Sequence, residues 1–161
     1  MIDDAILAQA AALLERCRGA GVRVATAESC TGGLVAAALS AIAESSAVLD
    51  RGFVTYSNMA KHEMLGVAMT LIDAHGAVSE EVARAMAEGA LSRSRAQLAV
   101  SVTGLAGPGG GTVAKPVGLV WVGCARTGQP TLAMRHLFAG DRTEIRQAAV
   151  AAALGMLTGR L

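Results

Sequence analysis

Apolar residues recur along the chain with one period typical of helices and another typical of buried strands. Helical spacing marks residues 4–19, and the short apolar run 22–27 that follows has the character of a strand buried on both faces. Apolar positions at helical spacing also indicate a helix from Cys30 or Thr31 to about Ala43. By the same criteria, further helices are expected at 58–66, 69–74, 79–94 and after 141, and strands at 48–57, 98–102, 118–125 and 131–138.

Two of the predicted helices begin with residues that suit a helix N-terminus. Ser79 is a capping residue followed by Glu80 and Glu81, whose negative charges favour the positive end of a helix. Asp141 and Glu144 have the spacing of a capping box. The last helix is expected to present an inner face formed by Ile145, Ala149, Ala152 and Met156.

The order α-β-α-β-α-α-β-β-β-α predicts an α/β fold. Alternating helices and strands favour a mostly parallel sheet covered on both faces, and the late hairpin adds an antiparallel part. The chain shows no internal repeat, long linker or low-complexity tail. We therefore expect residues 1–161 to form a single domain.

Composition narrows the classes of function. The net charge is +1, and two Phe, one Tyr and one Trp are the only aromatic residues, so we expect no nucleic-acid surface. No run reaches the length of a membrane span, and the acidic N-terminus lacks a signal-peptide pattern. Three widely spaced Cys predict neither disulfides nor a zinc site, so we expect a cytoplasmic protein.

The segment TAESCTGG (26–33) is the first candidate for chemistry, because it joins a predicted strand to a predicted helix. Ser29 there is a candidate nucleophile, since the amides of a helix start stabilise negative charge. Small residues after it, at Thr31, Gly32 and Gly33, allow a ligand to approach the backbone closely. A serine that only caps a helix is the commoner case, and the segment does not match G-x-S-x-G.

A serine nucleophile needs a base, and Lys61 is the first candidate if burial lowers its pKa. His62 is a rival base, although no acid is evident to orient it. Tyr56 is a candidate proton relay or substrate contact. Cys30 is a rival nucleophile, because a thiol at a helix start is expected to have a depressed pKa. For Lys61, Tyr56 and Cys30 the alternatives are a solvated lysine, a surface hydroxyl and a packing residue.

A glycine-rich loop, GLAGPGGGT (104–112), resembles a phosphate cradle in composition. It lacks the Gly-Lys-Ser/Thr ending of a P-loop, so the alternative is a flexible lid or a turn that approaches a ligand or another chain. Arg142, in the first turn of the last helix, is a candidate phosphate ligand. No metal-ligand spacing occurs, and we expect no metal and no cofactor.

Five motifs in order carry a family resemblance that covers about residues 5–159: TAESCTGG (26–33), GFVTYSNMAKHEMLGV (52–67), GAVSEEVA (76–83), SVTGLAGPGGGT (101–112) and KPVGLVWVG (115–123). The chain resembles the CinA C-terminal domain family, whose enzymatic members are bacterial nicotinamide-nucleotide amidohydrolases. The resemblance implies a three-layer α/β/α sandwich in a homodimer or larger homo-oligomer. It also implies the standalone form, without the N-terminal molybdopterin-binding-like domain that many members have.

The implied reaction hydrolyses the carboxamide of nicotinamide mononucleotide (NMN) to nicotinic acid mononucleotide and ammonia, which recycles pyridine nucleotides. The resemblance implies Ser29 as nucleophile, Lys61 as base and Tyr56 as its assistant. Implied substrate contacts come from the nucleophile segment, the glycine-rich loop and the last helix, at Cys30, Thr31, Gly32, Gly33, Thr103, Gly107 and Arg142. Two alternatives remain: a non-catalytic nucleotide-binding or competence- and DNA-damage-related interaction module, and an amidase for another phosphorylated amide.

Overall fold

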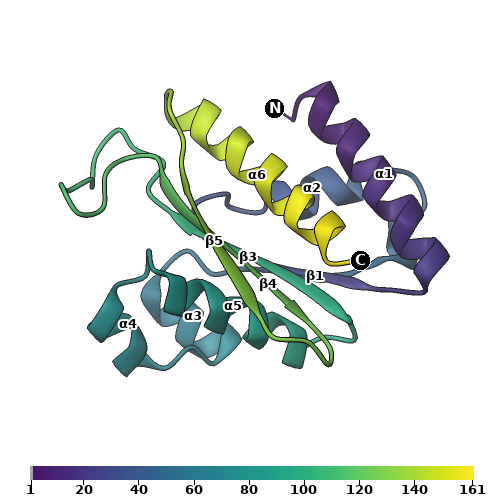
Figure 1. Ribbon diagram of the computed structural model, residues 1–161, viewed down its shortest axis with the longest axis horizontal. Coiled ribbons are helices and arrows are strands. Elements are labelled where there is room, and N and C mark those ends of the chain that lie inside the picture. Colours follow the sequence, from purple (N-terminus) through teal and green to yellow (C-terminus); the bar gives the residue numbers. More distant parts are fainter. Residues whose placement is uncertain (1) are drawn as a thin grey trace.

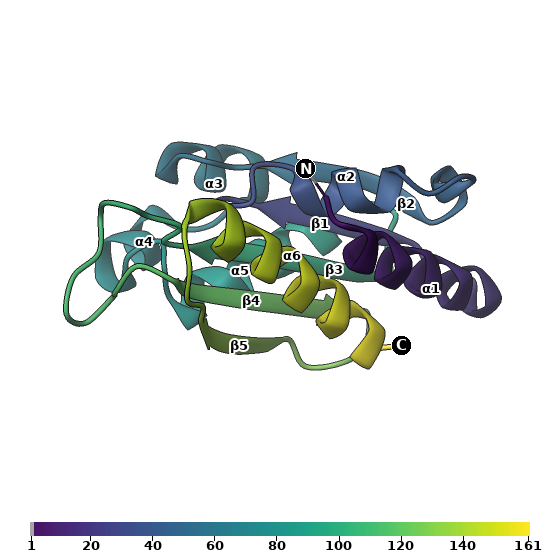
Figure 2. The same cartoon turned by 90° about the horizontal axis from the view of Figure 1, so that it is seen from above.

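The protein folds as a central five-stranded sheet between two layers of helices (Figures 1 and 2). The computed structural model describes residues 2–161. Within that range the strands are β1 (Val24–Glu28), β2 (Leu49–Val54), β3 (Leu98–Gly104), β4 (Leu119–Arg126) and β5 (Leu132–Leu137). The helices are α1 (Asp4–Ala20), α2 (Leu34–Ser40), α3 (Asn58–Leu65), α4 (Met69–His75), α5 (Glu80–Ser92) and α6 (Arg142–Gly159), with a short 3-10 turn at Ser45–Ala47.

The strand order is β2-β1-β3-β4-β5. β1 pairs in parallel with β2 and with β3, whereas β3–β4 and β4–β5 are antiparallel. Four strands therefore run in one direction and β4 runs against them, so the predicted antiparallel hairpin occupies one side of a mixed sheet. Helices α1, α2 and α6 cover one face and α3, α4 and α5 cover the other (Figure 1). The predicted three-layer α/β/α sandwich is confirmed.

Alternation along the strands divides the buried side chains between two cores. Even-numbered positions of β1 and β3, such as Val24 and Val100, pack under α1, α2 and α6. Odd-numbered positions, such as Ala25, Ala27 and Ala99, pack against the α5 layer. This follows from the two-residue period of an extended chain. The same alternation determines which face of the sheet is reached by the side chain of a residue directly after a strand.

The predicted caps are present. The Ser79 side chain accepts a hydrogen bond from the amide of Val82, and Asp141 and Glu144 form the complete capping box of α6. The inner face of α6 differs in part from the prediction. Ile145 and Ala149 are buried, but the helix leans so that Ala153, Leu154 and Leu157 complete the core, while Ala152 and Met156 are only half-buried.

The predicted start of the second helix is wrong. That helix, α2, begins at Leu34 and ends at Ser40, not over residues 31–43. Gly32 and Gly33 have φ values of 59° and 102°, a left-handed conformation that glycine adopts without strain and that a helix does not contain. Residues 29–33 thus form a separate turn between β1 and α2.

Candidate active site

Ser29 lies one residue beyond β1, at the point where the strand ladder ends. Its amide donates to the carbonyl of Val102 at 2.9 Å, which extends the parallel pairing of β1 and β3 by one step. Because Ser29 continues the odd-numbered series of Ala25 and Ala27, its side chain lies on the sheet face covered by α3, α4 and α5. The hydroxyl is thereby directed toward the layer that carries Lys61.

Glu28 does the opposite and turns toward α2. Its carboxylate accepts hydrogen bonds from the amides of Val35 at 2.8 Å and Ala36 at 3.0 Å, and its residue is 1% exposed. The first free amides of α2 are therefore occupied by a side chain of the protein itself. The expectation that this helix start stabilises charge at Ser29 is wrong, and any stabilisation must come from the turn at 29–33.

Lys61 is buried, at 1% exposure, on the inner side of α3 together with Leu65 one turn later. Its Nζ lies 3.0 Å from Ser29 Oγ and 2.9 Å from the carbonyl oxygen of Thr55, with the carbonyl of Tyr56 at 3.4 Å. A solvated lysine, the alternative considered from the sequence, is excluded. The two carbonyls fix the lysine nitrogen beside the serine oxygen.

The environment of Lys61 changes its protonation. Burial lowers the pKa of its ammonium group from 10.5 to about 8, and the smaller effect of Cys30 acts in the opposite direction. At pH 7, about a tenth of the protein molecules then carry a neutral Lys61, whereas well under a thousandth of ordinary lysines are neutral at this pH. A neutral lysine within hydrogen-bond distance of a serine hydroxyl is the arrangement of a general base and its nucleophile.

Tyr56 and Arg142 meet across the mouth of the site. Arg142, the first residue of α6, donates from Nη2 to the Tyr56 hydroxyl at 3.1 Å and from Nη1 to the Gly107 carbonyl at 2.7 Å. Tyr56 lies beyond the end of β2 and is 62% exposed. The arginine thus ties the glycine-rich loop to the segment that precedes α3.

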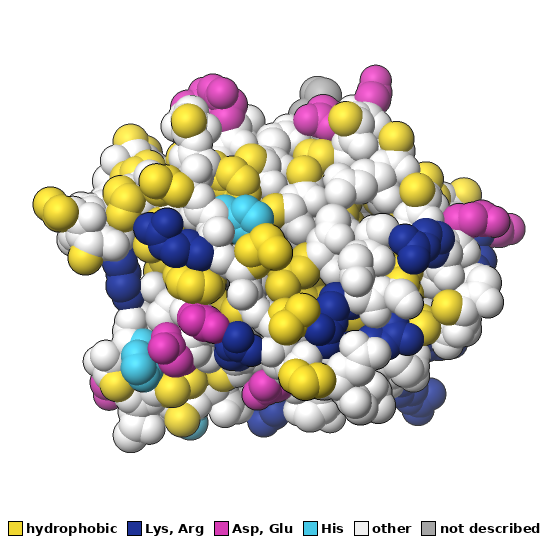
Figure 3. All heavy atoms as spheres, in the orientation of Figure 1, with side chains coloured by type: hydrophobic (Ala, Val, Ile, Leu, Met, Phe, Trp, Pro, Cys, Tyr) yellow, Lys and Arg dark blue, Asp and Glu magenta, His cyan; other side chains and the backbone are white. Residues whose placement is uncertain are grey.

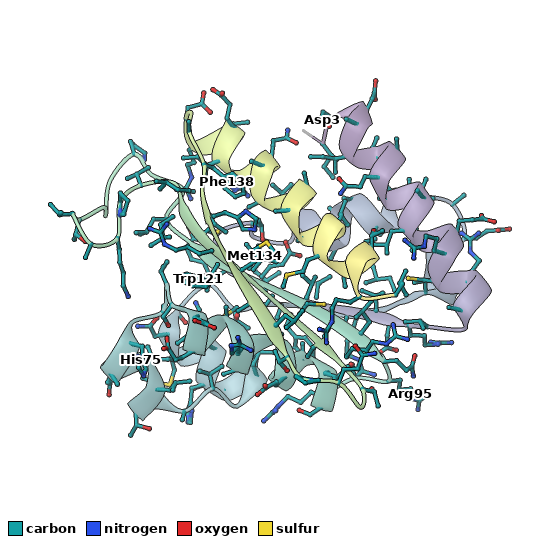
Figure 4. All side chains as sticks on the ribbon, viewed as in Figure 1. Asp3, His75, Arg95, Trp121, Met134 and Phe138 are labelled. Atoms are coloured by element: carbon teal, nitrogen blue, oxygen red, sulfur yellow. The ribbon has the colours of Figure 1, made fainter. Side chains whose placement is uncertain are left out.

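Thr103 stands beside Ser29 in the next strand. The register of β1 and β3 pairs Glu28 with Val102, so one further step brings Ser29 alongside Thr103 on the same face. The Thr103 hydroxyl donates to the carbonyl of Ala77 at 2.8 Å, which leaves its oxygen free to accept. Trp121, opposite Thr103 on β4, lies on this side of the sheet as well (Figure 4).

These side chains surround one cavity of about 260 Å³ at the carboxyl ends of β1, β2 and β3. In open α/β sheets, ligands bind at the carboxyl ends of the strands, at the point where the strand order reverses. Here that point is β1, which has β2 on one side and β3 on the other. The lining residues come from the ends of these strands, from α3 and from the glycine-rich loop: Ser29, Cys30, Tyr56, Asn58, Lys61, Ala77, Val78, Thr103, Gly104, Leu105, Ala106, Gly107, Gly109 and Arg142.

The structure brings together seven of the ten residues selected from the sequence: Ser29, Cys30, Tyr56, Lys61, Thr103, Gly107 and Arg142. Thr31, Gly32 and Gly33 lie behind the nucleophile and do not line the cavity. Sequence reasoning missed Glu28 and Ala77. The position of Glu28, a carboxylate directly before a turn that leads into a helix, is a sequence signal that indicates its role. Ala77 has no such signal and is identified only by its contact with Thr103.

The two rival catalytic residues are placed unfavourably. Burial raises the pKa of the Cys30 thiol from 9.0 to about 11, so the expected depression is wrong. The cause of the error is the missing helix start: the thiol is enclosed by apolar groups instead of facing free helix amides. His62 directs Nδ1 to the carbonyl of Val67 at 2.8 Å and does not line the cavity.

Two further properties concern the rest of the described chain. No helix within residues 2–161 combines the length and the apolar character that crossing a bilayer requires. Nowhere in the same range do three or more His, Cys, Asp and Glu side chains gather in a manner suited to a metal ion.

The fold and site together define an α/β protein with a buried serine–lysine pair at the carboxyl edge of its sheet. Residues 7–161 match the CinA C-terminal domain, and the chain belongs to that family. It is 46% identical over 157 residues to the nicotinamide-nucleotide amidohydrolase PncC of Escherichia coli (strain K12), and the match covers 98% of this chain and 95% of that protein. It is 51% identical over 143 residues to a CinA-like protein of Syntrophobacter fumaroxidans, covering 89% of this chain.

The chain spans only 34% of the length of that CinA-like relative. Among solved structures, the competence/damage inducible protein CihA from Agrobacterium tumefaciens superimposes with a TM-score of 0.96 at 49% identity, covering 99% of this chain and 97% of that one. The α/β architecture derived above is therefore that of known members of the family.

Proposed function

We propose that this protein hydrolyses the carboxamide of NMN to nicotinic acid mononucleotide and ammonia, with Ser29 as nucleophile and Lys61 as general base. The observation that carries the proposal is the 3.0 Å contact between Lys61 Nζ and Ser29 Oγ inside a cavity. The substrate follows from relatives named nicotinamide-nucleotide amidohydrolase at 46–56% identity. The reaction needs no cofactor and no metal.

In the first half of the reaction, neutral Lys61 accepts the proton of the Ser29 hydroxyl as Oγ attacks the carboxamide carbon. The carbonyl π electrons move to oxygen and form a tetrahedral oxyanion. When this collapses, the C–N bond breaks and the Lys61 ammonium returns its proton to the departing nitrogen, which leaves as ammonia. In the second half, Lys61 accepts a proton from water, hydroxide attacks the acyl carbon, and Ser29 regains its proton as the acid is released.

The turn after Ser29 supplies the donors for the oxyanion. Within residues 2–161, the amides of Cys30 and Thr31 donate to no backbone or side-chain oxygen. Amides that have no acceptor oxygen within the protein are available to hydrogen-bond a ligand. The amide of the residue after a serine nucleophile is a recurrent oxyanion donor, and Cys30 N–H holds that position here.

The remaining cavity residues bind the rest of the substrate. Thr103 accepts from the carboxamide nitrogen, since its own proton is engaged by Ala77. Arg142 uses two of its donors on Gly107 and Tyr56, so its further N–H groups are available to a phosphate. Tyr56 assists by fixing that guanidinium and by passing a proton at the open side of the site.

The test is ammonia release from NMN by the wild type, Ser29→Ala and Lys61→Ala. We expect both variants to lose activity by about 10⁴-fold or more, as removal of a nucleophile or base does in other hydrolases. Ser40→Ala, at an exposed position near the end of α2, is the matched control and keeps full activity. Substantial turnover by Ser29→Ala would exclude the serine mechanism.

The same assay separates the other interpretations. Saturable NMN binding without turnover by the wild type would favour a nucleotide-binding or interaction module. Equal rates with NMN, nicotinamide and the riboside would remove the role of the phosphate and of Arg142. Turnover that requires the phosphate supports the proposal as stated.

We propose further that the protein is cytoplasmic, that residues 1–161 act as one domain and that two copies associate through β5. The three free cysteines suit a reducing compartment, and one continuous sheet joins both cores.

β5 is an edge strand with exposed Leu132 and Met134, beside an apolar groove of about 370 Å³ against α6 (Figures 3 and 4). Two such edges pair about a twofold axis. Met134→Lys should convert the assembly to monomers in sedimentation velocity, and an unchanged sedimentation coefficient would oppose this interface.

A further inference from the structure

Within residues 2–161, Arg146 is the cationic side chain whose donors contact the carbonyls of the turn at 29–33, from the side of α6. It lies one helical turn after Arg142 on α6, and both side chains point toward the same end of the sheet. Arg142 lines the cavity, whereas Arg146 does not. It is therefore placed to act on the turn and not on the substrate.

Two hydrogen bonds join Arg146 to the turn. Its Nε donates to the carbonyl of Cys30 at 3.0 Å and its Nη2 donates to the carbonyl of Thr31 at 3.1 Å. Thr31 also accepts from the amide of Leu34, but the Cys30 carbonyl has no other hydrogen-bond donor within residues 2–161. The guanidinium fork, whose donors have fixed directions, thus determines the orientation of the Cys30–Thr31 peptide.

The orientation of this peptide decides where its amide points. The Cys30–Thr31 bond is trans, so its N–H and C=O groups point in opposite directions. With the carbonyl held toward α6 by Arg146, the Thr31 N–H faces away from α6. Within residues 29–33 of the described chain, the amides of Cys30, Thr31 and Gly33 have no acceptor oxygen, and of these three residues only Cys30 lines the cavity.

The surroundings of Arg146 are consistent with a dedicated role. Within the described chain no carboxylate lies within 4.0 Å of its guanidinium, so its charge is not neutralised by an ion pair. Gly32 lies against the guanidinium, at a distance where a Cβ would be in ordinary contact with Nη2 at 3.4 Å, so its positive φ of 59° and not the space favours glycine there. A positive charge held against the turn also favours an oxyanion on its other side.

We propose that Arg146 is a positioning residue for the oxyanion site: by holding the Cys30–Thr31 peptide it fixes the turn in which the amide of Cys30, a residue that lines the cavity, faces the developing negative charge. This inference rests on the proposed function, because it takes Ser29 to be the nucleophile. It does not depend on NMN as the substrate. Any carbonyl or phosphonyl centre attacked by Ser29 requires the same amides.

The experiment compares the wild type with Arg146→Ala, Arg146→Lys and Arg16→Ala. Arg16 donates to the carbonyl of Thr158 at the other end of α6, at 3.5 Å, so its removal also deletes an arginine-to-carbonyl contact but leaves the turn unchanged. Two rates are measured on each protein. One is steady-state ammonia release from NMN, and the other is modification of Ser29 by a fluorophosphonate, followed by intact mass.

We expect Arg146→Ala to lower kcat and the rate of Ser29 modification by about tenfold to a hundredfold, somewhat less than the loss of an oxyanion donor itself. The KM for NMN should change by less than about threefold, because Arg146 does not contact the cavity. Arg146→Lys, which keeps the charge and one donor, should recover part of both rates. Arg16→Ala should match the wild type.

The outcomes are separable. If Arg146→Ala loses thermal stability but keeps both rates at a temperature where it is folded, Arg146 is only structural and the inference is wrong. If the alanine variant does not fold, equal rates for Arg146→Lys and the wild type overturn it as well. A wild type that is modified at Ser29 but does not hydrolyse NMN refutes the proposed substrate alone, and one that is not modified refutes both.

Discussion

Lys61→Met should abolish amide hydrolysis and at the same time make the protein more stable at neutral pH. Methionine has a similar length and no charge, so it fills the space of the buried lysine on α3 without its desolvation cost. The expected gain arises because the active protein keeps an ionisable group where an apolar one would be favoured. Stability and the proposed function oppose each other at this residue.

The magnitude follows from the pKa. A fall from 10.5 in the unfolded chain to about 8 in the fold means that protonated Lys61 is disfavoured by about 3 kcal/mol on folding. The variant leaves Ser29 Oγ and the Thr55 carbonyl without the donor they share, at about 1 kcal/mol each. The balance favours Lys61→Met by about 1 kcal/mol at pH 7.

The difference must change with pH. Between pH 8 and 10.5 the unfolded chain binds the lysine proton more tightly than the fold does, so the wild type gains stability as pH rises through this window. From pH 7 to 9.5 the gain is about 2 kcal/mol, and it is absent in Lys61→Met. The variant should therefore become the less stable protein at pH 9.5.

Urea unfolding of both proteins at pH 7, 8, 9 and 9.5 measures this difference. Burial raises the pKa of Cys17, Cys30 and Cys124, which lowers stability at high pH in both proteins, so the comparison between them removes most of this shared contribution. In parallel, kcat/KM of the wild type should rise with pH and level off above about 8, as the base becomes neutral. A free-energy difference that stays constant over this range, or a rate that does not fall below pH 8, would refute the reasoning.

Two further variants test the surroundings of the nucleophile. Glu28→Gln should reduce the free energy of unfolding by about 1–3 kcal/mol, because a charged acceptor of two α2 amides is replaced by a neutral one. The control is Glu15→Gln. The side chain of Glu15 is 81% exposed, so this substitution should change the free energy of unfolding by less than about 0.5 kcal/mol. Cys30→Ala should keep most of the ammonia-release activity, because burial holds the thiol pKa near 11 and the group stays protonated; a loss as large as that of Ser29→Ala would make Cys30 part of the chemistry.

Local signals predicted the elements well where neighbouring residues decide them. The order of helices and strands, the caps at Ser79 and Asp141 and the late hairpin all follow from periods and end residues that interact within a few positions. The same kind of reasoning was wrong at residues 30–33. The apolar positions that predicted this helix begin only at Leu34, and two glycines with positive φ together with the buried Glu28 carboxylate set the helix start at that residue.

By itself, the sequence identified the candidate catalytic residues and predicted that Ser29 follows a buried strand. Only the tertiary structure decided that Lys61 is buried and that its Nζ lies 3.0 Å from Ser29 Oγ, 32 positions away along the chain. The reason is physical: protonation depends on how much water the surrounding elements remove, which no local pattern records. Burial lowers the pKa of the Lys61 ammonium and raises that of the Cys30 thiol, so the same enclosure favours the neutral form of both groups.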